Sequence, residues 1–165
     1  MPEDALGIAG VQNRTWQHAY AHAFPAEQLA SLDDERRAEW WRWLLTDGPK
    51  TTHVVVVDGA ESVVGFASFG RTFDEPAQLG ELFSIYVLPE ASGRGIGRSL
   101  MAATLSRLRG DGFEEAILWV LEDNPRTRRF YEEAGWYPDG GVKDETLLET
   151  LVREIRYRIA LDGSR

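Results

Sequence analysis

The sequence contains no cysteine. This absence excludes disulfide bonds, thiolate metal ligands and a cysteine nucleophile, and it gives no sign of an oxidising compartment. The chain also lacks a run of roughly 18 apolar residues, the length that a membrane-spanning helix needs, and its first residues carry no basic segment typical of a leader. We therefore expect a soluble, cytoplasmic protein with no membrane partner.

Repeats, low-complexity tracts and linkers are absent as well from the 165 residues. Hydrophobic residues make up 43% of the chain and charged residues 27%, a balance that allows one domain to bury its own core. The sequence predicts a single domain over residues 1–165.

Basic residues are scarce, since 18 Lys and Arg stand against 27 Asp and Glu, for a net charge of −9. Proteins that bind nucleic acids present a basic excess to the phosphates, so we expect no nucleic-acid partner. Residues 94–129 differ from the remainder, with seven arginines and five acidic residues. This unevenness is either a chance fluctuation on a solvated surface, or it marks an anionic ligand on this segment and a cationic substrate drawn to the acidic remainder.

Hydrophobic periodicity, caps and turn residues predict a mixed α/β or α+β fold. The expected elements are helices over residues 8–23 and 31–47, strands over 52–57 and 63–69 joined by a turn at Asp58-Gly59, a strand over 82–88, a helix from Ser99 to Gly110, a strand over 116–121, a helix capped by Asn124 and closed by Gly135, and a strand over 152–161. The strand-helix-strand in the middle implies parallel strands joined by a right-handed crossover.

Aromatic residues are concentrated in the predicted second helix. Ser31 is its expected N-cap, and Trp40, Trp43 and Leu44 share one face. Of the three tryptophans there, Trp41 included, we expect at least two to be packing residues.

Three histidines offer no metal site. His18 and His22 stand four residues apart on the predicted first helix, but no third ligand accompanies them, and His53 is isolated. We expect all three at the surface and no bound metal.

The run Ser92-Gly93-Arg94-Gly95-Ile96-Gly97-Arg98 separates a predicted strand from a predicted helix. Glycines let a backbone approach a ligand closely, and a helix start presents free N–H groups and the positive end of its dipole. The run therefore predicts an anion-binding cradle, suited to the diphosphate of a nucleotide-type cofactor.

Of three other interpretations of the run, two do not fit the residues and one stays open. The dinucleotide fingerprint fails because Arg98 stands where it needs its third glycine, and no Gly-Lys-Ser/Thr of a phosphate-binding loop occurs in the chain. A tight turn without a ligand remains open, although three closely spaced glycines cost chain entropy.

Residues 79–100, LGELFSIYVLPEASGRGIGRSL, resemble the acetyl-CoA motif of the GNAT family of N-acetyltransferases, Gln/Arg-x-x-Gly-x-Gly/Ala. Gly95 and Gly97 fill both glycine places, whereas Ser92 replaces the expected Gln or Arg. The resemblance implies a central mixed sheet flanked by helices and a bound acetyl-CoA. The residues it assigns to the cofactor are Ile85, Tyr86 and Val87 along the pantetheine arm, and Gly93, Arg94, Gly95, Ile96, Gly97 and Arg98 around the diphosphate.

A second motif follows at the family's distance. Residues 118–136, LWVLEDNPRTRRFYEEAGW, resemble the family's next segment, which implies that Asn124 contacts the cofactor and that Tyr131 approaches the thioester sulfur. Asn124 is equally an N-cap, and Tyr131 a core aromatic. Members of the family usually begin with a strand before the first helix, and we expect this sheet to be one strand short.

The resemblance also implies roles in acyl transfer. Glu81 occupies the place of a catalytic carboxylate and is the candidate base, with a solvated strand-entry residue as the alternative. Tyr131 is the candidate general acid, because a phenol can donate a proton to a thiolate of similar basicity. The N–H of Val87 is expected to polarise the acetyl carbonyl.

Further residues are assigned with alternatives. Trp16 and Tyr20 share a helix face and either line the acceptor pocket together with Glu81 or pack in the core. Arg126, Arg128 and Arg129 crowd a helix start, where cations are unfavourable, so we expect at least one to approach a phosphate of CoA.

These observations predict an acetyl-CoA-dependent N-acetyltransferase that acts on the primary amine of a small, cationic acceptor by direct transfer. The alternatives are a non-catalytic module that binds acetyl-CoA or CoA, and a protein N-acetyltransferase. An exposed sheet edge also favours a homodimer in which the partner chain covers that edge. The acceptor itself is not encoded in any motif, since its pocket would involve the first helices and the loop at residues 71–78.

Overall fold

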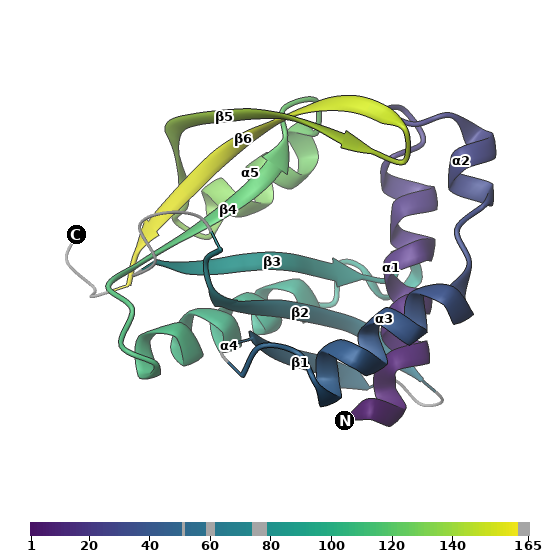
Figure 1. Cartoon of the computed structure of the whole chain (residues 1–165). Helices are drawn as coiled ribbons and strands as arrows, with labels where there is room; N and C mark the ends of the chain where they lie inside the picture. Colours follow the sequence, from purple (N-terminus) through teal and green to yellow (C-terminus); the bar gives the residue numbers. More distant parts are fainter. Residues whose placement is uncertain (51, 59–61, 74–78, 162–165) are drawn as a thin grey trace. The chain divides into compact units, whose positions relative to one another are not determined.

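The computed structural model describes residues 1–50, 52–58, 62–73 and 79–161 (Figure 1). Its elements are the short 3-10 turn η1 (Pro2–Asp4), helices α1 (Ala5–Ala19), α2 (Ala26–Ala30) and α3 (Asp34–Thr46), strands β1 (Thr52–Asp58), β2 (Val63–Arg71) and β3 (Gly80–Val87), the 3-10 turn η2 (Pro89–Ala91), helix α4 (Ile96–Gly110), strand β4 (Glu115–Leu121), helix α5 (Pro125–Glu133), and strands β5 (Tyr137–Leu147) and β6 (Thr150–Ala160).

The six strands are ordered β1-β2-β3-β4-β6-β5. Strands β3 and β4 pair in parallel through Gly80 with Ala116 and Glu81 with Ile117, while β6 pairs antiparallel with both β4 and β5. The chain passes from β3 to β4 through α4, which is the crossover that parallel strands require. The mixed α/β prediction is confirmed.

The chain divides into two compact units. The first comprises residues 1–68 and 84–102, and the second comprises residues 69–83 and 103–165. That residues 1–165 act as a single domain stays a prediction.

Packing in the first unit centres on α1 and α3, which lie side by side in Figure 1. Ile8 and Val11 of α1 are fully buried, together with Ala38 of α3 and Phe66 of β2. Trp41 of α3 is 2% exposed and meets the Phe66 ring edge-on at 5.1 Å between centroids. Burying a side chain of this size contributes several kcal/mol, so this cluster anchors α3 on the sheet.

The predicted face of α3 was wrong. Trp40 and Trp43 are 51% and 50% exposed, and Trp41 alone of the three is in the core. The buried stripe runs through Ala38 and Trp41, which are three residues apart, and the indole N–H of Trp41 donates to Gln12 at 3.0 Å. A polar partner on α1 thus helps to select which tryptophan faces inward.

Two predicted helix starts were also displaced. The N-cap of α3 is Asp33, whose carboxylate accepts from the Arg36 N–H at 2.7 Å, whereas Ser31 ends the unpredicted short helix α2. Helix α4 begins at Ile96 rather than Ser99, so its first turn lies inside the glycine run.

In the second unit, α5 packs on one face of the antiparallel strands. Tyr157 of β6 is fully buried and its hydroxyl donates to Glu132 of α5 at 2.7 Å, while Arg128 of α5 donates to the same hydroxyl at 3.2 Å. Rings of Tyr131 and Tyr157 lie 6.4 Å apart. This side-chain network fixes the helix on the sheet.

Strand β5 was missing from the prediction. Its start contains Pro138, Asp139 and Gly140, residues typical of turns, and most of its side chains are exposed. A bulge between Pro138 and Val142 accommodates them. Tertiary contacts, rather than propensity, place this segment in the sheet.

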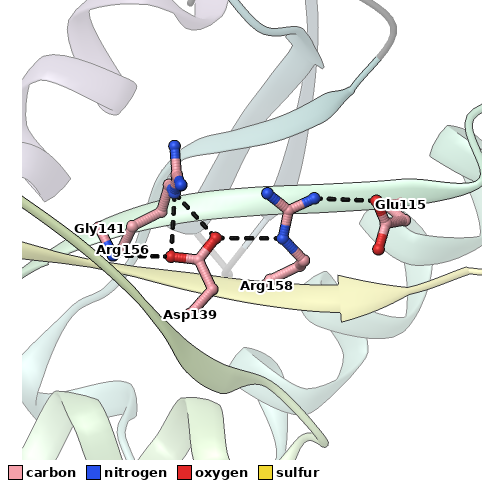
Figure 2. Close-up of polar contacts among 5 residues, drawn as sticks. All are labelled: Glu115, Asp139, Gly141, Arg156 and Arg158. Carbon is pink, nitrogen blue, oxygen red and sulfur yellow. Dashed lines mark hydrogen bonds and ion pairs between the residues drawn. The ribbon is translucent and has the colours of Figure 1, made fainter. Parts of the chain in front are cut away.

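Asp139 ties that bulge to its neighbours (Figure 2). Its carboxylate accepts from Arg156 at 2.9 Å, from Arg158 at 3.1 Å and from the Gly141 N–H at 3.0 Å, and Arg158 also donates to Glu115 of β4 at 2.8 Å. Burial by itself would raise the pKa of Asp139, but these hydrogen bonds outweigh it and hold the pKa below its ordinary value.

The N-terminal residues and the edge of the sheet bear on two of the predictions. Residues 1–50 form helices and turns without a strand, in keeping with the expected loss of the first strand, and β1 is one edge of the sheet. A homodimer covering that edge stays a prediction. Gly59 of the predicted turn and residues 74–78 of the predicted acceptor loop lie outside the described residues.

No helix in the described ranges is both long and apolar enough to cross a membrane. No group of three or more His, Cys, Asp or Glu in those ranges could hold a metal ion. His18 and His22 are exposed as expected, whereas His53 is half-buried in β1.

Candidate active site

The glycine run forms a main-chain cradle, defined here as residues 92–98. Gly93 and Gly95 have φ of +79° and +82°, a conformation that costs any residue with a Cβ. The Ser99 N–H donates to the Gly95 carbonyl at 3.0 Å, which makes Gly95 the N-cap of α4. Within the described chain, the N–H groups of residues 93–98 donate to no other backbone group. These N–H groups are therefore available to donate hydrogen bonds to an anion.

Two arginines flank these N–H groups. Arg94 and Arg98 are exposed and form no ion pair with any described residue, although both lie at the positive end of the α4 dipole. Cations there cost about 0.3 to 1 kcal/mol each without an anion. The Ser92 hydroxyl turns back to the Leu88 carbonyl at 3.3 Å, so the cradle relies on backbone groups and arginines.

The last residues of β3 before the cradle have a main-chain edge that pairs with no strand among the described residues. The Leu88 N–H donates to Val64 of β2, and the Tyr86 carbonyl faces Gly65 of the same strand. Because successive residues of a strand point to opposite edges, Ile85 and Val87 direct their N–H and C=O groups away from β2. Pairing with β4 is confined to Gly80 and Glu81, so this part of the edge has no partner strand among the described residues.

Side chains of helix α1 donate hydrogen bonds to that strand. The Thr15 hydroxyl donates to the Val87 carbonyl at 3.4 Å, and the Trp16 indole N–H donates to the Tyr86 hydroxyl at 3.0 Å. Trp16 and Tyr20 are half-buried, with ring centroids 5.1 Å apart, and both rest on the buried Phe24. Of the predicted acceptor-binding residues, these two therefore lie in the same unit as the cradle.

The remaining predicted residues belong to the second unit. Glu81 is half-buried in β3 and accepts a hydrogen bond from the buried Thr72 hydroxyl at 2.7 Å. Asn124 is the N-cap of α5, with its side-chain oxygen accepting from the Thr127 N–H at 3.1 Å, as predicted. Tyr131 is 7% exposed on the buried side of α5.

The arginines of α5 differ in their engagement. Arg128 donates to Tyr157 and to the Glu122 carbonyl, and its bond to the tyrosine raises its pKa. Arg129 pairs with Glu133 at 3.0 Å. Arg126 is exposed and has no ion pair in the described ranges, so it is the one of the three left for a phosphate.

A family model matches this arrangement. The model of the acetyltransferase (GNAT) family covers residues 13–136, from α1 through the cradle to the end of α5. The chain belongs to the GNAT family.

Relatives support the assignment. An uncharacterized N-acetyltransferase of Bacillus subtilis, YuaI, is 36% identical over 124 residues, which are 74% of this chain and 69% of the relative. The mycothiol acetyltransferase of Actinosynnema mirum is 32% identical over 81% of this chain, but this chain spans only 40% of it. A crystal structure of the paia N-acetyltransferase from Thermoplasma acidophilum with coenzyme A superposes with a TM-score of 0.71 at 18% identity, covering 96% of this chain and 94% of that one.

The GNAT domain is thus an acetyl-CoA-dependent acetyltransferase, and the family resemblance seen in the two motifs is confirmed. The residues 93–98 fit a diphosphate because their N–H groups and two arginines are all uncommitted within the described chain.

The sequence patterns did not identify three polar residues of this GNAT domain. Thr15 and Thr72, which bond Val87 and Glu81, lie in no motif, and only tertiary contacts reveal them. Arg37 sits in the charged run Asp33-Asp34-Glu35-Arg36-Arg37, which is typical of a solvated helix start. It is nevertheless half-buried, and burial lowers its pKa despite the attraction of Tyr86 and Asp34.

Proposed function

We propose that this GNAT domain transfers the acetyl group of acetyl-CoA to the primary amine of a small molecule by direct attack in a ternary complex. The observation that carries the proposal is the cradle, whose six consecutive N–H groups lack backbone acceptors in the described chain. A carboxylate would occupy two such donors, whereas a diphosphate has enough oxygens for all of them.

The main chain of β3 continues the cofactor's path in this proposal. Ile85 and Val87 have edge groups without a partner strand among the described residues, which suits an extended pantetheine amide that pairs like a further strand. The N–H of Val87 is then the donor to the acetyl oxygen. Asn124 and an arginine, Arg126, supply further contacts to the cofactor.

The transfer needs three proton events. The acceptor ammonium loses a proton to Glu81, directly or through a water, and the neutral nitrogen attacks the acetyl carbon. The C–S bond breaks as the C–N bond forms, and the Tyr131 hydroxyl gives a proton to the leaving thiolate. The nitrogen then loses its second proton through solvent to the Tyr131 phenolate, which leaves a neutral amide, free CoA thiol and a neutral tyrosine. Base and acid contributions of this kind are each about 100-fold or more.

Glu81 suits the role of base because Thr72 fixes its orientation at 2.7 Å. Tyr131 suits the role of acid because it is 7% exposed and packs at 5.5 Å from Phe130 and 6.4 Å from Trp136, which limits competing water. With no cysteine in the chain, direct transfer without an acetyl-enzyme is favoured.

The small-molecule acceptor rests on two supports. The mycothiol acetyltransferases carry the name of a small molecule, and the net charge of −9 favours approach of a cationic amine. The non-catalytic CoA-binding module and the protein N-acetyltransferase are the competing functions.

The test is release of free thiol from acetyl-CoA across a panel of small amines and one amine-bearing peptide. We expect release with small amines and initial rates that give intersecting double-reciprocal lines, since both substrates bind before reaction. A melting temperature raised by acetyl-CoA without thiol release from any acceptor would establish the binding module instead. Release with the peptide alone would establish the protein N-acetyltransferase.

Tyr131→Phe tests the acid. The variant should lower kcat by about 100-fold while the Kd of acetyl-CoA stays within about threefold, because only the proton donor is lost. Tyr137→Phe, at an exposed tyrosine outside the proposed machinery, is the matched control. A wild-type kcat in Tyr131→Phe would reduce Tyr131 to a packing residue.

A further inference from the structure

Arg37 of the first unit is half-buried, and its guanidinium has no hydrogen bond or ion pair among the described residues. Arg37 lies one turn before Trp41 on α3, so the two side chains share a helix face. Trp41 packs on Phe66 at 5.1 Å, and Phe66 meets Tyr86 of β3 at 5.6 Å. Arg37 therefore sits on the sheet-facing side of α3, at the end of this aromatic row.

Near Arg37, the Tyr86 hydroxyl and one carboxylate oxygen of Asp34 accept hydrogen bonds from other donors. Tyr86 accepts from the Trp16 indole at 3.0 Å, and Asp34 accepts from the Asn13 amide at 2.7 Å. The guanidinium of Arg37 itself has no hydrogen bond or ion pair to any described residue. Tyr86 and Asp34 attract its charge only at longer range, and burial lowers its pKa.

This arrangement is costly for the free protein. A guanidinium has five N–H donors in a fixed fork, and partial burial without an acceptor sacrifices hydration without compensation. A ligand carboxylate restores that loss through two parallel charge-assisted hydrogen bonds. A ligand that carries only a cation cannot accept these hydrogen bonds from the guanidinium.

Arg37 lies in the same unit as residues assigned to the acceptor pocket and to the cofactor. Trp16, which the family resemblance assigns to the acceptor pocket, donates to the hydroxyl of Tyr86. Tyr86 stands between Ile85 and Val87, the two β3 residues proposed to pair with the cofactor. All of these residues belong to one compact unit.

We propose that Arg37 binds a carboxylate of the acceptor, so that the acetylated molecule is an amino acid or another amine with a carboxylate, rather than a polyamine. The proposal rests on the proposed transfer function. The ammonium of such an acceptor still suits the acidic chain, and its carboxylate selects the site at Arg37.

The experiment compares matched acceptors that differ only in this group, namely amino acids and the corresponding amino acid amides. For the wild-type protein, kcat/KM should be about tenfold to 100-fold higher for the acid than for the amide, the range that a charge-assisted hydrogen-bonded pair provides. Arg37→Gln should remove this preference by raising KM for the acid, with kcat/KM for the amide changed by about threefold at most. Arg36→Gln, at the exposed neighbouring arginine, should keep the preference.

Binding without turnover gives a second readout. In the presence of CoA, amino acids should raise the melting temperature of the wild type more than their amides do, and this difference should vanish in Arg37→Gln. Arg37→Lys keeps the cation without the fork and should show a reduced preference, which covers a failure of Arg37→Gln to fold.

The outcomes separate the two proposals. Thiol release with amines but no preference for the acid, or a preference unchanged in both Arg37 variants, overturns the carboxylate site and leaves the transfer function standing. Absence of thiol release with every amine overturns the transfer function itself.

Discussion

Gly95 shows at the scale of one residue how conformation and proposed binding are joined. Its φ of +82° lets the chain turn from the end of η2 into α4 with the N–H groups of the cradle exposed. A Cβ built there meets nothing within 4 Å, so the demand for glycine is conformational in the free protein. A diphosphate seated on the N–H groups would add a steric demand.

We expect Gly95→Ala to lower the free energy of unfolding by about 1 to 2 kcal/mol through its positive φ, and to weaken CoA binding at least tenfold. Calorimetric titration with CoA and a denaturant melt measure the two effects.

Gly112→Ala is the matched control, since Gly112 has φ of +88° and equally open surroundings after α4. It should lose similar stability and keep its CoA affinity. Equal affinity loss in both variants would mean that backbone strain alone, rather than a cradle, explains Gly95.

Asp139 illustrates how one carboxylate sets a pH dependence. Its pKa is held below the ordinary value, so its contribution to stability is complete above the unfolded-state pKa of about 3.9 and is lost as pH falls through the lower, folded value. The side chain is 9% exposed, and losing it leaves Arg156 without its carboxylate.

Asp139→Asn should cost about 1 to 3 kcal/mol at pH 7 and should flatten the decline of stability below pH of about 4. Urea denaturation over a pH series measures both. Asp144→Asn, in an exposed pair with Arg153, should change little. A pH profile of Asp139→Asn parallel to the wild type would show that this carboxylate titrates normally.

Among the elements, α5 carries two predicted functions at its first turn. Asn124 caps the helix through Thr127, and the family resemblance also assigns its amide to the cofactor. An aspartate would keep the accepting oxygen and remove the amide donor.

Asn124→Ala should therefore lose about 1 kcal/mol of stability along with CoA affinity, whereas Asn124→Asp should keep stability and lose affinity alone. Thermal melts with and without CoA report on both. An Asn124→Asp variant with wild-type affinity would restrict Asn124 to capping.

The elements also show which parts of the fold the sequence could predict. Strands β1 and β4 were located to within a few residues, because the β-branched residues of β1 and the continuous, largely buried apolar run of β4 each leave a local signal. β5 was missed because Asp139 and its arginine partners, distant in sequence, hold a turn-like segment in the sheet.

In the candidate active site too, some residues could be predicted from the sequence and others could not. The cradle was predictable because a positive φ needs glycine and a helix start needs free N–H groups, both visible in the residue pattern. Arg37 was not, because its burial depends on which face of α3 meets β2, and the competing tryptophans concealed that face.

At the scale of the whole molecule, the net negative charge of the chain opposes binding of the anionic cofactor. An acidic chain that binds a highly anionic cofactor needs a local site that overcomes general repulsion, and the cradle offers this through backbone dipoles and arginines. Binding should stabilise the folded state by about 2.7 kcal/mol at one hundred times the Kd.

The most direct test of the account is a crystal structure of the protein with acetyl-CoA. The account predicts diphosphate oxygens within hydrogen-bond distance of the N–H groups of residues 93–98, and the thioester beside the main chain of Val87. A diphosphate bound elsewhere, with those N–H groups facing solvent, would contradict it.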